Sequence, residues 1–119
     1  MERDSLILYA KIEALFFQVY PTLKNYPKAE HHALCIQIKQ CFVGLLEKVG
    51  VAKEVPSRRR QALQEAAGRI RNLVTLFRLS RKQRYISVGF FEQVDLKITE
   101  IKKILVGFMK AASRTRPAP

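Results

Sequence analysis

Apolar residues recur at helical spacing, every three or four positions, in four segments of this chain. No segment shows the period-two alternation of a half-buried strand, so the sequence predicts an all-α protein. Asp4 or Ser5 can cap a first helix. We expect that helix to run to about Leu23, because Pro21 and Pro27 interrupt the pattern there.

The second and third helices are separated by Pro56. The second is expected to begin after Pro27 and to reach about Val49, with Gly50 as a left-handed cap. The third is expected to begin at Pro56-Ser57. Each carries an apolar stripe that would face the core, namely Leu34, Ile38, Phe42, Leu45 and Val49 in the second helix, and Leu63, Ala66, Ile70, Leu73, Val74 and Phe77 in the third.

The fourth helix follows a break at 85–87, where Ser87 can act as its N-cap, and is expected from Val88 to about Ala112. Its inward positions would be Phe91, Val94, Ile98, Ile101, Leu105 and Phe108. Long helices joined by short connections favour antiparallel neighbours, so we expect an up-down-up-down four-helix bundle. This single domain would span residues 1–112, and residues 113–119 would form a basic, proline-containing flexible tail.

The first helix is apolar around nearly its whole circumference, with polar residues only on a narrow edge and at Glu13. A helix of a single bundle needs one apolar face of limited width. Self-association is therefore expected, and the alternative is a few exposed aromatic residues without a partner. The candidate interface residues are Leu8, Ile12, Phe16 and Tyr20 in the first helix and Leu76 in the third.

The composition is that of a globular protein, with 48% apolar and 27% charged residues in a chain of 119. No run approaches the roughly 20 uninterrupted apolar residues of a membrane span, and the acidic start at 1–4 argues against a signal peptide. Cys35 and Cys41 are six positions apart on one predicted helix, which turns them to nearly opposite faces. They cannot pair with each other, so reduced thiols and a cytoplasmic location are expected.

Positive charge is concentrated between Ser57 and Arg84, where nine basic residues stand against one acid, Glu65. This segment carries eight of the twelve net positive charges of the chain. At about 100° per residue, Arg60, Arg71, Arg78 and Lys82 fall within roughly 40° of one another, on an arc away from the apolar stripe. Like charges repel unless an anion lies against them, so the stripe predicts polyanion binding. A solvated charged face is the alternative, but such faces usually mix both signs.

The basic residues favour contact with phosphate groups over reading of bases. Eight of the nine are arginine, whose planar fork suits phosphate and carboxylate groups. The run at 58–60 also lies at a helix start, beside unpaired backbone N–H groups. No aromatic residue interleaves with the stripe, so base stacking is not predicted. The candidate nucleic-acid-binding residues are Arg58, Arg59, Arg60, Arg71, Arg78, Lys82 and Arg84.

Catalytic constellations are incomplete in this sequence. His31 and Cys35 have the i, i+4 spacing of half a zinc site, but no second pair completes it. The acids Glu92, Asp95 and Glu100 of the fourth helix fit surface ion pairs better than acid–base work. No glycine-rich phosphate loop or nucleophile elbow is present. We expect a protein that is not an enzyme and that uses no metal or other cofactor.

Two connections resemble a known family. Tyr26-Pro27-Lys28-Ala29-Glu30-His31 resembles the opening of the second helix in the bacterial four-helix-bundle family of 23S rRNA intervening-sequence proteins and diversity-generating retroelement accessory (Avd) proteins. Arg84-Tyr85-Ile86-Ser87 is similar to that family's Gly-Tyr-Ile-Ser turn, with Arg84 in place of glycine. The resemblance covers roughly 6–109. The Asn-Ile-Ala-Glu-Gly signature of the intervening-sequence proteins is replaced by Glu47-Lys48-Val49-Gly50-Val51, so the chain looks more like the Avd branch.

The resemblance implies a ring-shaped homopentamer with a basic surface. It further implies that the protein binds RNA or DNA and docks onto a retroelement reverse transcriptase, assisting mutagenic copying of a template repeat. The alternatives are a scaffold, or an intervening-sequence-type protein, whose basic face docks an acidic protein partner.

Overall fold

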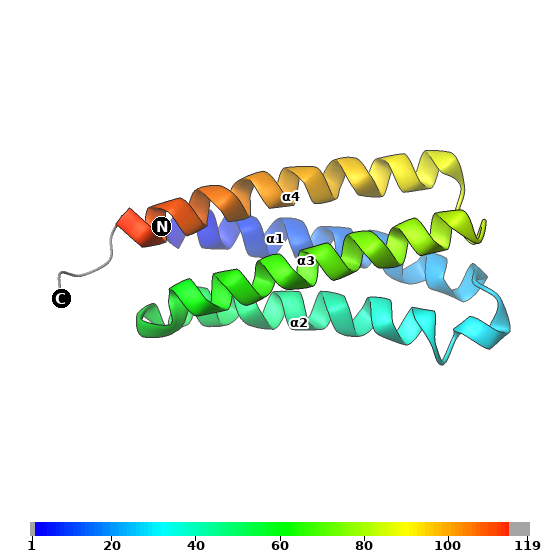
Figure 1. Ribbon diagram of the computed structural model, residues 1–119, viewed down its shortest axis with the longest axis horizontal. Coiled ribbons are helices and arrows are strands. Elements are labelled where there is room, and N and C mark those ends of the chain that lie inside the picture. Colours follow the sequence, from blue (N-terminus) through cyan, green and yellow to red (C-terminus); the bar gives the residue numbers. More distant parts are fainter. Residues whose placement is uncertain (1, 115–119) are drawn as a thin grey trace.

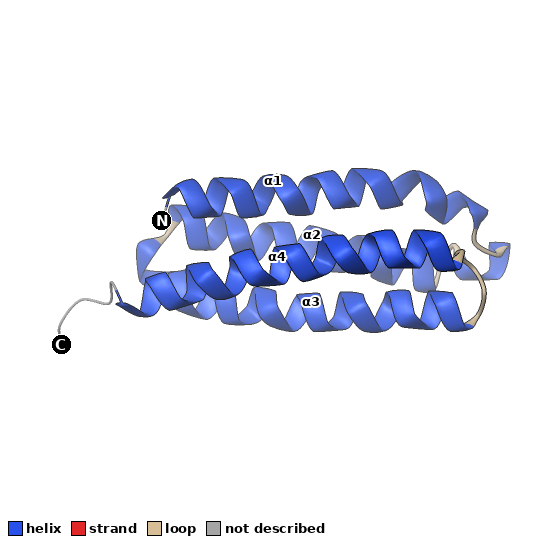
Figure 2. Ribbon diagram, turned by 90° about the horizontal axis from the view of Figure 1, so that it is seen from above, coloured by secondary structure: helices blue, strands red, loops and turns tan. Residues whose placement is uncertain are grey.

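The structure is a computed structural model that describes residues 2–114. Its four helices are α1 (Glu2–Val19), α2 (Leu34–Glu54), α3 (Arg59–Lys82) and α4 (Val88–Arg114); short 3-10 helices, η1 (Tyr20–Asn25), η2 (Lys28–Glu30) and η3 (Pro56–Arg58), lie in the connections. Successive helices run in opposite directions and pack side by side, and α4 closes the bundle against α1 (Figures 1 and 2). The predicted all-α four-helix fold is confirmed.

An aromatic layer crosses the middle of the core. Phe42 of α2 is fully buried and lies between two other rings. Its centroid is 4.9 Å from that of Phe16, in a stacked arrangement, and 6.3 Å from that of Phe77, edge to face. The predicted inward positions of α2 are all buried, as are those of α3 and α4 except Val74 and Phe91, which are half-buried.

The start and end of α1 differ from the prediction. The helix begins at Glu2, so Asp4 and Ser5 lie within its first turns instead of capping it. Ser5 is buried there. The α-helix ends at Val19, because Pro21 has no N–H to donate, and the chain continues as the tighter helix η1.

The end of α2 also lies beyond the predicted one. Gly50 is an interior residue of α2, and no glycine in the described part of the chain has a positive φ. Two residues later Ala52 is still fully buried, so continuing the helix buries additional apolar surface. The helix stops at Glu54, because Val55 precedes Pro56 and takes an extended conformation.

Arg84 stands in a left-handed conformation between α3 and α4, with φ of 63°. The Tyr85 N–H donates to the Ser80 carbonyl at 2.9 Å, and the Arg84 N–H donates to the Arg81 carbonyl at 3.0 Å. This is the Schellman ending of a helix, in which glycine usually holds the left-handed position. A side chain there costs about 1–2 kcal/mol.

The beginning of α4 is as predicted, since the Phe90 N–H donates to the Ser87 hydroxyl at 3.0 Å. Its end is two residues later than expected. Ser113 and Arg114, assigned to the tail from the sequence, belong to α4, and the remainder of the predicted tail, 115–119, lies outside the described residues.

The two connections that carry the family resemblance meet at one end of the bundle. The Tyr85 hydroxyl donates to the Glu30 carboxylate at 2.9 Å. The Tyr85 ring also packs 5.4 Å from that of Tyr26. The α1–α2 connection and the α3–α4 turn are thus tied together, which fixes the end of α3 relative to the rest of the fold (Figure 1).

By length and composition alone, the segment Arg3–Asn25 could cross a membrane. In the bundle, one face of this segment supplies core residues. Leu8, Ile12, Leu15 and Val19 are almost completely buried against the other helices. Only 28% of the segment is buried, so this packing accounts for part of its apolar character.

Replacing Phe42 with alanine tests the aromatic layer. Phe42→Ala should lower the free energy of unfolding by about 3–5 kcal/mol, because it removes a buried ring and leaves a cavity. Val43→Ala is the matched control at the next position of α2, where the side chain is 53% exposed; it should change stability by about 0.5 kcal/mol or less. Urea unfolding followed by circular dichroism measures both, and equal effects would contradict the assigned core.

Candidate nucleic-acid interface

Four basic side chains follow the length of α3 on its outer surface. Arg60, Arg71, Arg78 and Lys82 are all exposed, as the sequence predicts, and Gln64 and Thr75 fill the gaps between them. With a rise of about 1.5 Å per residue, this basic stripe is about 33 Å long. The opposite face of α3 is buried, so the stripe is presented on a helix held by the core.

Acidic residues do not neutralise the stripe. Glu65, the only acid of α3, pairs with Lys48 of α2 at 2.6 Å and accepts a hydrogen bond from Gln61 at 3.1 Å. These contacts hold the pKa of Glu65 below its usual value. The other ion pair among the described residues joins Lys11 and Glu100, on α1 and α4. Neither of these ion pairs includes a residue of the basic stripe.

Arg59, one of the predicted nucleic-acid-binding residues, has a structural role. Its Nε donates to the Ala52 carbonyl at 2.6 Å, and its Nη2 donates to the Lys53 carbonyl at 3.3 Å. These carbonyls belong to the last turn of α2, which has no intrahelical donors for them. The guanidinium of Arg59 thus caps α2, a role that the sequence did not predict, and its contact with a nucleic acid stays a prediction.

The other predicted residues form an extended surface and not one pocket. Arg58 and Arg60 lie at the α2–α3 end of the bundle, whereas Arg78, Lys82 and Arg84 lie at the opposite end (Figure 1). The stripe joins these two ends, with Arg71 near its middle. A compact anion could contact only one end at a time, whereas a linear polyanion could contact both.

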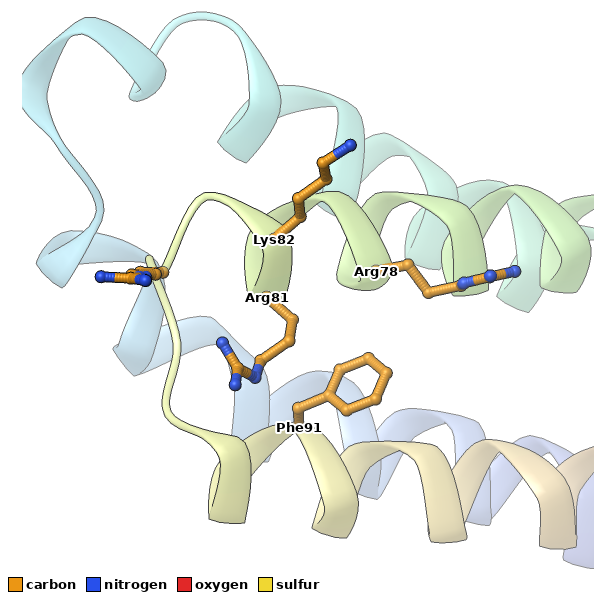
Figure 3. Close-up of a pocket in the computed structure, with 5 residues that line it drawn as sticks. Arg78, Arg81, Lys82 and Phe91 are labelled. Atoms are coloured by element: carbon orange, nitrogen blue, oxygen red, sulfur yellow. The ribbon is translucent and has the colours of Figure 1, made fainter.

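The end of α3 carries a pocket that the sequence did not reveal. An open hollow of about 480 Å³ is lined by Arg78, Arg81, Lys82, Arg84 and Phe91. In Figure 3, Arg81 extends toward α4, where Phe91 points back toward it, while Lys82 points away from α4. We call this cluster the basic tip. The sequence pattern places Phe91 in the core, against which it is half-buried, and Arg81 beside the stripe, so it does not predict that they line one hollow.

The predicted self-association residues of α1 are placed largely inside the fold. Leu8 and Ile12 are fully buried in the core, so they are wrong as interface residues. Phe16 is half-buried against Phe42, and Leu76 is half-buried at the edge of the core. Tyr20 is exposed, with the Lys39 ammonium 5.0 Å from its ring centroid.

Apolar side chains of α1 are nevertheless exposed at other positions. Phe17 is 65% exposed, Leu6 is 49% exposed and Ile7 is 38% exposed. Leu6 and Phe17 are eleven residues apart in the sequence, which places them within about 20° of each other on the helix surface. The predicted surplus of apolar surface is present, on a different arc of the helix from the one expected.

The thiols are buried and separate. Cys35 donates to the Leu23 carbonyl at 3.6 Å and Cys41 to the Arg69 carbonyl at 3.0 Å, and neither forms a disulfide. Burial raises the pKa of both thiols, which keeps them protonated and poorly nucleophilic at neutral pH. His31 contacts the Tyr26 carbonyl at 2.9 Å. The described residues contain no group of three or more side chains able to hold a metal ion.

Comparison with known proteins identifies one family. The family model described as bAvd-like matches residues 6–112, which is most of the chain and includes all four helices. No curated protein and no solved structure matches the chain. The match confirms the family resemblance seen in the two connections.

Replacing Arg59 with methionine separates its capping role from ligand binding. Arg59→Met should lower the free energy of unfolding by about 1–2 kcal/mol, because two charge-assisted hydrogen bonds to α2 are lost. Arg60→Met is the control at the next position and should change stability by about 0.5 kcal/mol or less. Thermal and urea unfolding measure both variants. The capping role is excluded if Arg59→Met unfolds like the wild type.

Proposed function

We propose that this chain, which belongs to the bAvd-like family of accessory proteins, is a non-catalytic protein that binds nucleic acid through the basic stripe of α3. The observation that carries the proposal is the stripe itself, with exposed basic residues along its length and, within the described part of the chain, no acid in an ion pair with them. Phosphate groups lying against these side chains would relieve their mutual repulsion, and the counterions released from the phosphate backbone would favour binding further.

The dimensions of the stripe fit a duplex. Its length of about 33 Å equals roughly ten base pairs at a spacing of about 3.4 Å per pair. The side chains on it are mostly arginine, which forms two parallel hydrogen bonds to a phosphate. Such contacts fix position on the backbone and carry no sequence information, so we propose weakly selective binding of RNA or DNA with a strong dependence on salt.

The family suggests association with a retroelement. We propose that the protein acts in the cytoplasm beside a reverse transcriptase and holds the RNA template or the DNA product during copying. The alternative, an acidic protein partner for the basic face, would show as tight protein binding beside weak binding of nucleic acid.

We also propose that the protein works as a homo-oligomer, in the pentameric ring that the family resemblance implies. The exposed apolar side chains on α1, Leu6, Ile7 and Phe17, support this part of the proposal. Large apolar side chains that share an exposed face often mark a protein interface.

Charge reversal in the stripe tests the nucleic-acid proposal. Arg71→Glu combined with Arg78→Glu should reduce affinity for duplex DNA and structured RNA by at least about tenfold at low salt, and should flatten the log–log salt dependence by about two. Fluorescence anisotropy at several salt concentrations measures both quantities. Lys103→Glu with Lys110→Glu, at two exposed positions of α4, is the control with the same change of net charge.

Equal losses in the two double variants would mean that only net charge matters, and the stripe would not be the binding site. No binding by the wild-type protein at low salt would contradict the proposed function as a whole. Circular dichroism of each variant shows whether its helices are intact.

Polar substitution on α1 tests the assembly. Leu6→Ser combined with Phe17→Ser should shift the protein from oligomer to monomer in sedimentation velocity, because the shared apolar surface is removed. Leu96→Ser is the control, since Leu96 of α4 is 71% exposed. An unchanged sedimentation coefficient in the α1 variant would exclude α1 as the contact surface.

A further inference from the structure

Arg84 is an arginine at a position that suits glycine. Its φ of 63° lies in the left-handed region, where a side chain is strained and glycine is not. The Schellman hydrogen bonds around it involve only backbone atoms, so glycine would keep them. Strain of this kind persists at sites where the side chain itself has a function.

Three further basic side chains surround the same hollow. Arg78, Arg81 and Lys82 line it together with Arg84, and no acidic residue lines it. Positive charge in the last turn of a helix is favourable by itself, because the C-terminal end of the helix dipole is negative. This effect accounts for Arg81 and Lys82. It does not account for an arginine in the strained position, nor for Arg78 one turn earlier.

Phe91 gives the hollow an apolar wall. The ring belongs to the first turns of α4, is half-buried, and points from α4 toward Arg81 (Figure 3). One part of the ring packs against the core, and a phosphate alone would use the cations without covering the rest of the ring. A nucleotide joins an anion to a flat aromatic base, and bases stack on aromatic side chains in proteins that bind single strands.

We propose that the basic tip binds one unpaired nucleotide of a nucleic-acid strand, with the phosphate against Arg81 and Arg84 and the base against Phe91. The inference rests on the proposed function and deepens it, since the stripe would hold the duplex backbone while the tip distinguishes an unpaired nucleotide. Strand ends, overhangs and bulges are the forms that offer one.

The experiment compares a blunt duplex with the same duplex carrying a short single-stranded overhang. Fluorescence anisotropy with the full chain should show tighter binding of the overhang by the wild type. Phe91→Leu keeps the apolar volume but removes the stacking surface, and should lower affinity for the overhang about tenfold while leaving the blunt duplex unchanged. An overhang made of abasic nucleotides has no base to stack. Its affinity for the wild type should equal the reduced affinity of the intact overhang for Phe91→Leu.

Arg84→Gly provides a variant whose folding is not in question. Glycine relieves the left-handed strain, so the unfolding midpoint should rise, while affinity for the overhang should fall about two- to fivefold. A residue with only a structural role would not combine greater stability with weaker binding. Lys110→Gln is the control for loss of one exposed charge at the other end of α4.

The possible results separate the two proposals. If the wild type binds neither probe, the proposed function fails and the tip fails with it. If it binds both probes equally, or if Phe91→Leu weakens both alike, nucleic-acid binding stands and the nucleotide site is overturned. Poly-glutamate and an unlabelled oligonucleotide are then compared as competitors for the bound overhang. If poly-glutamate displaces the overhang as readily as the oligonucleotide does, the tip is a general anion surface and the nucleotide site is overturned.

Discussion

The burial of one face of α3 between α2 and α4 allows its other face to carry a stripe of cations. Leu63, Ile70, Leu73 and Phe77 are all buried on that face. Each such side chain contributes about 1.5–3 kcal/mol on leaving water. Repulsion between exposed charges in water is a smaller effect for each pair, and it is screened by salt. The core therefore holds α3 in place although its surface charges repel one another.

The connections decide where the ends of this helix lie. At one end the guanidinium of Arg59 satisfies the last carbonyls of α2, which binds the start of α3 to the end of its neighbour. At the other end the hydrogen bond between Tyr85 and Glu30 ties the α3–α4 turn to the α1–α2 connection. One arginine of the basic run is thus used for structure, and the rest are available to a ligand.

Sequence periodicity predicts the core well and the surface chemistry less well. Wherever a helix has a narrow apolar stripe, its spacing predicts the buried face. On α1 the stripe is too wide for its centre to be defined, so the sequence predicts an oligomer interface at Leu8, which is buried, and not at Phe17, which is exposed. The capping role of Arg59 depends on carbonyls from another helix, and the contribution of Phe91 to the tip depends on the α3–α4 turn. Neither can be deduced from the pattern of a single helix.

The arrangement of the helices bears on how assembly and nucleic-acid binding could coexist. The helix α1 packs mainly against α2 and α4, so it lies diagonally across the bundle from α3 (Figure 2). Its exposed residues, Leu6 and Phe17 among them, are on the far side of the core from the basic stripe. Subunits that associate through α1 would therefore leave each stripe facing outward. Several stripes on one assembly could then contact a single strand together, which strengthens binding without any new contact within a subunit.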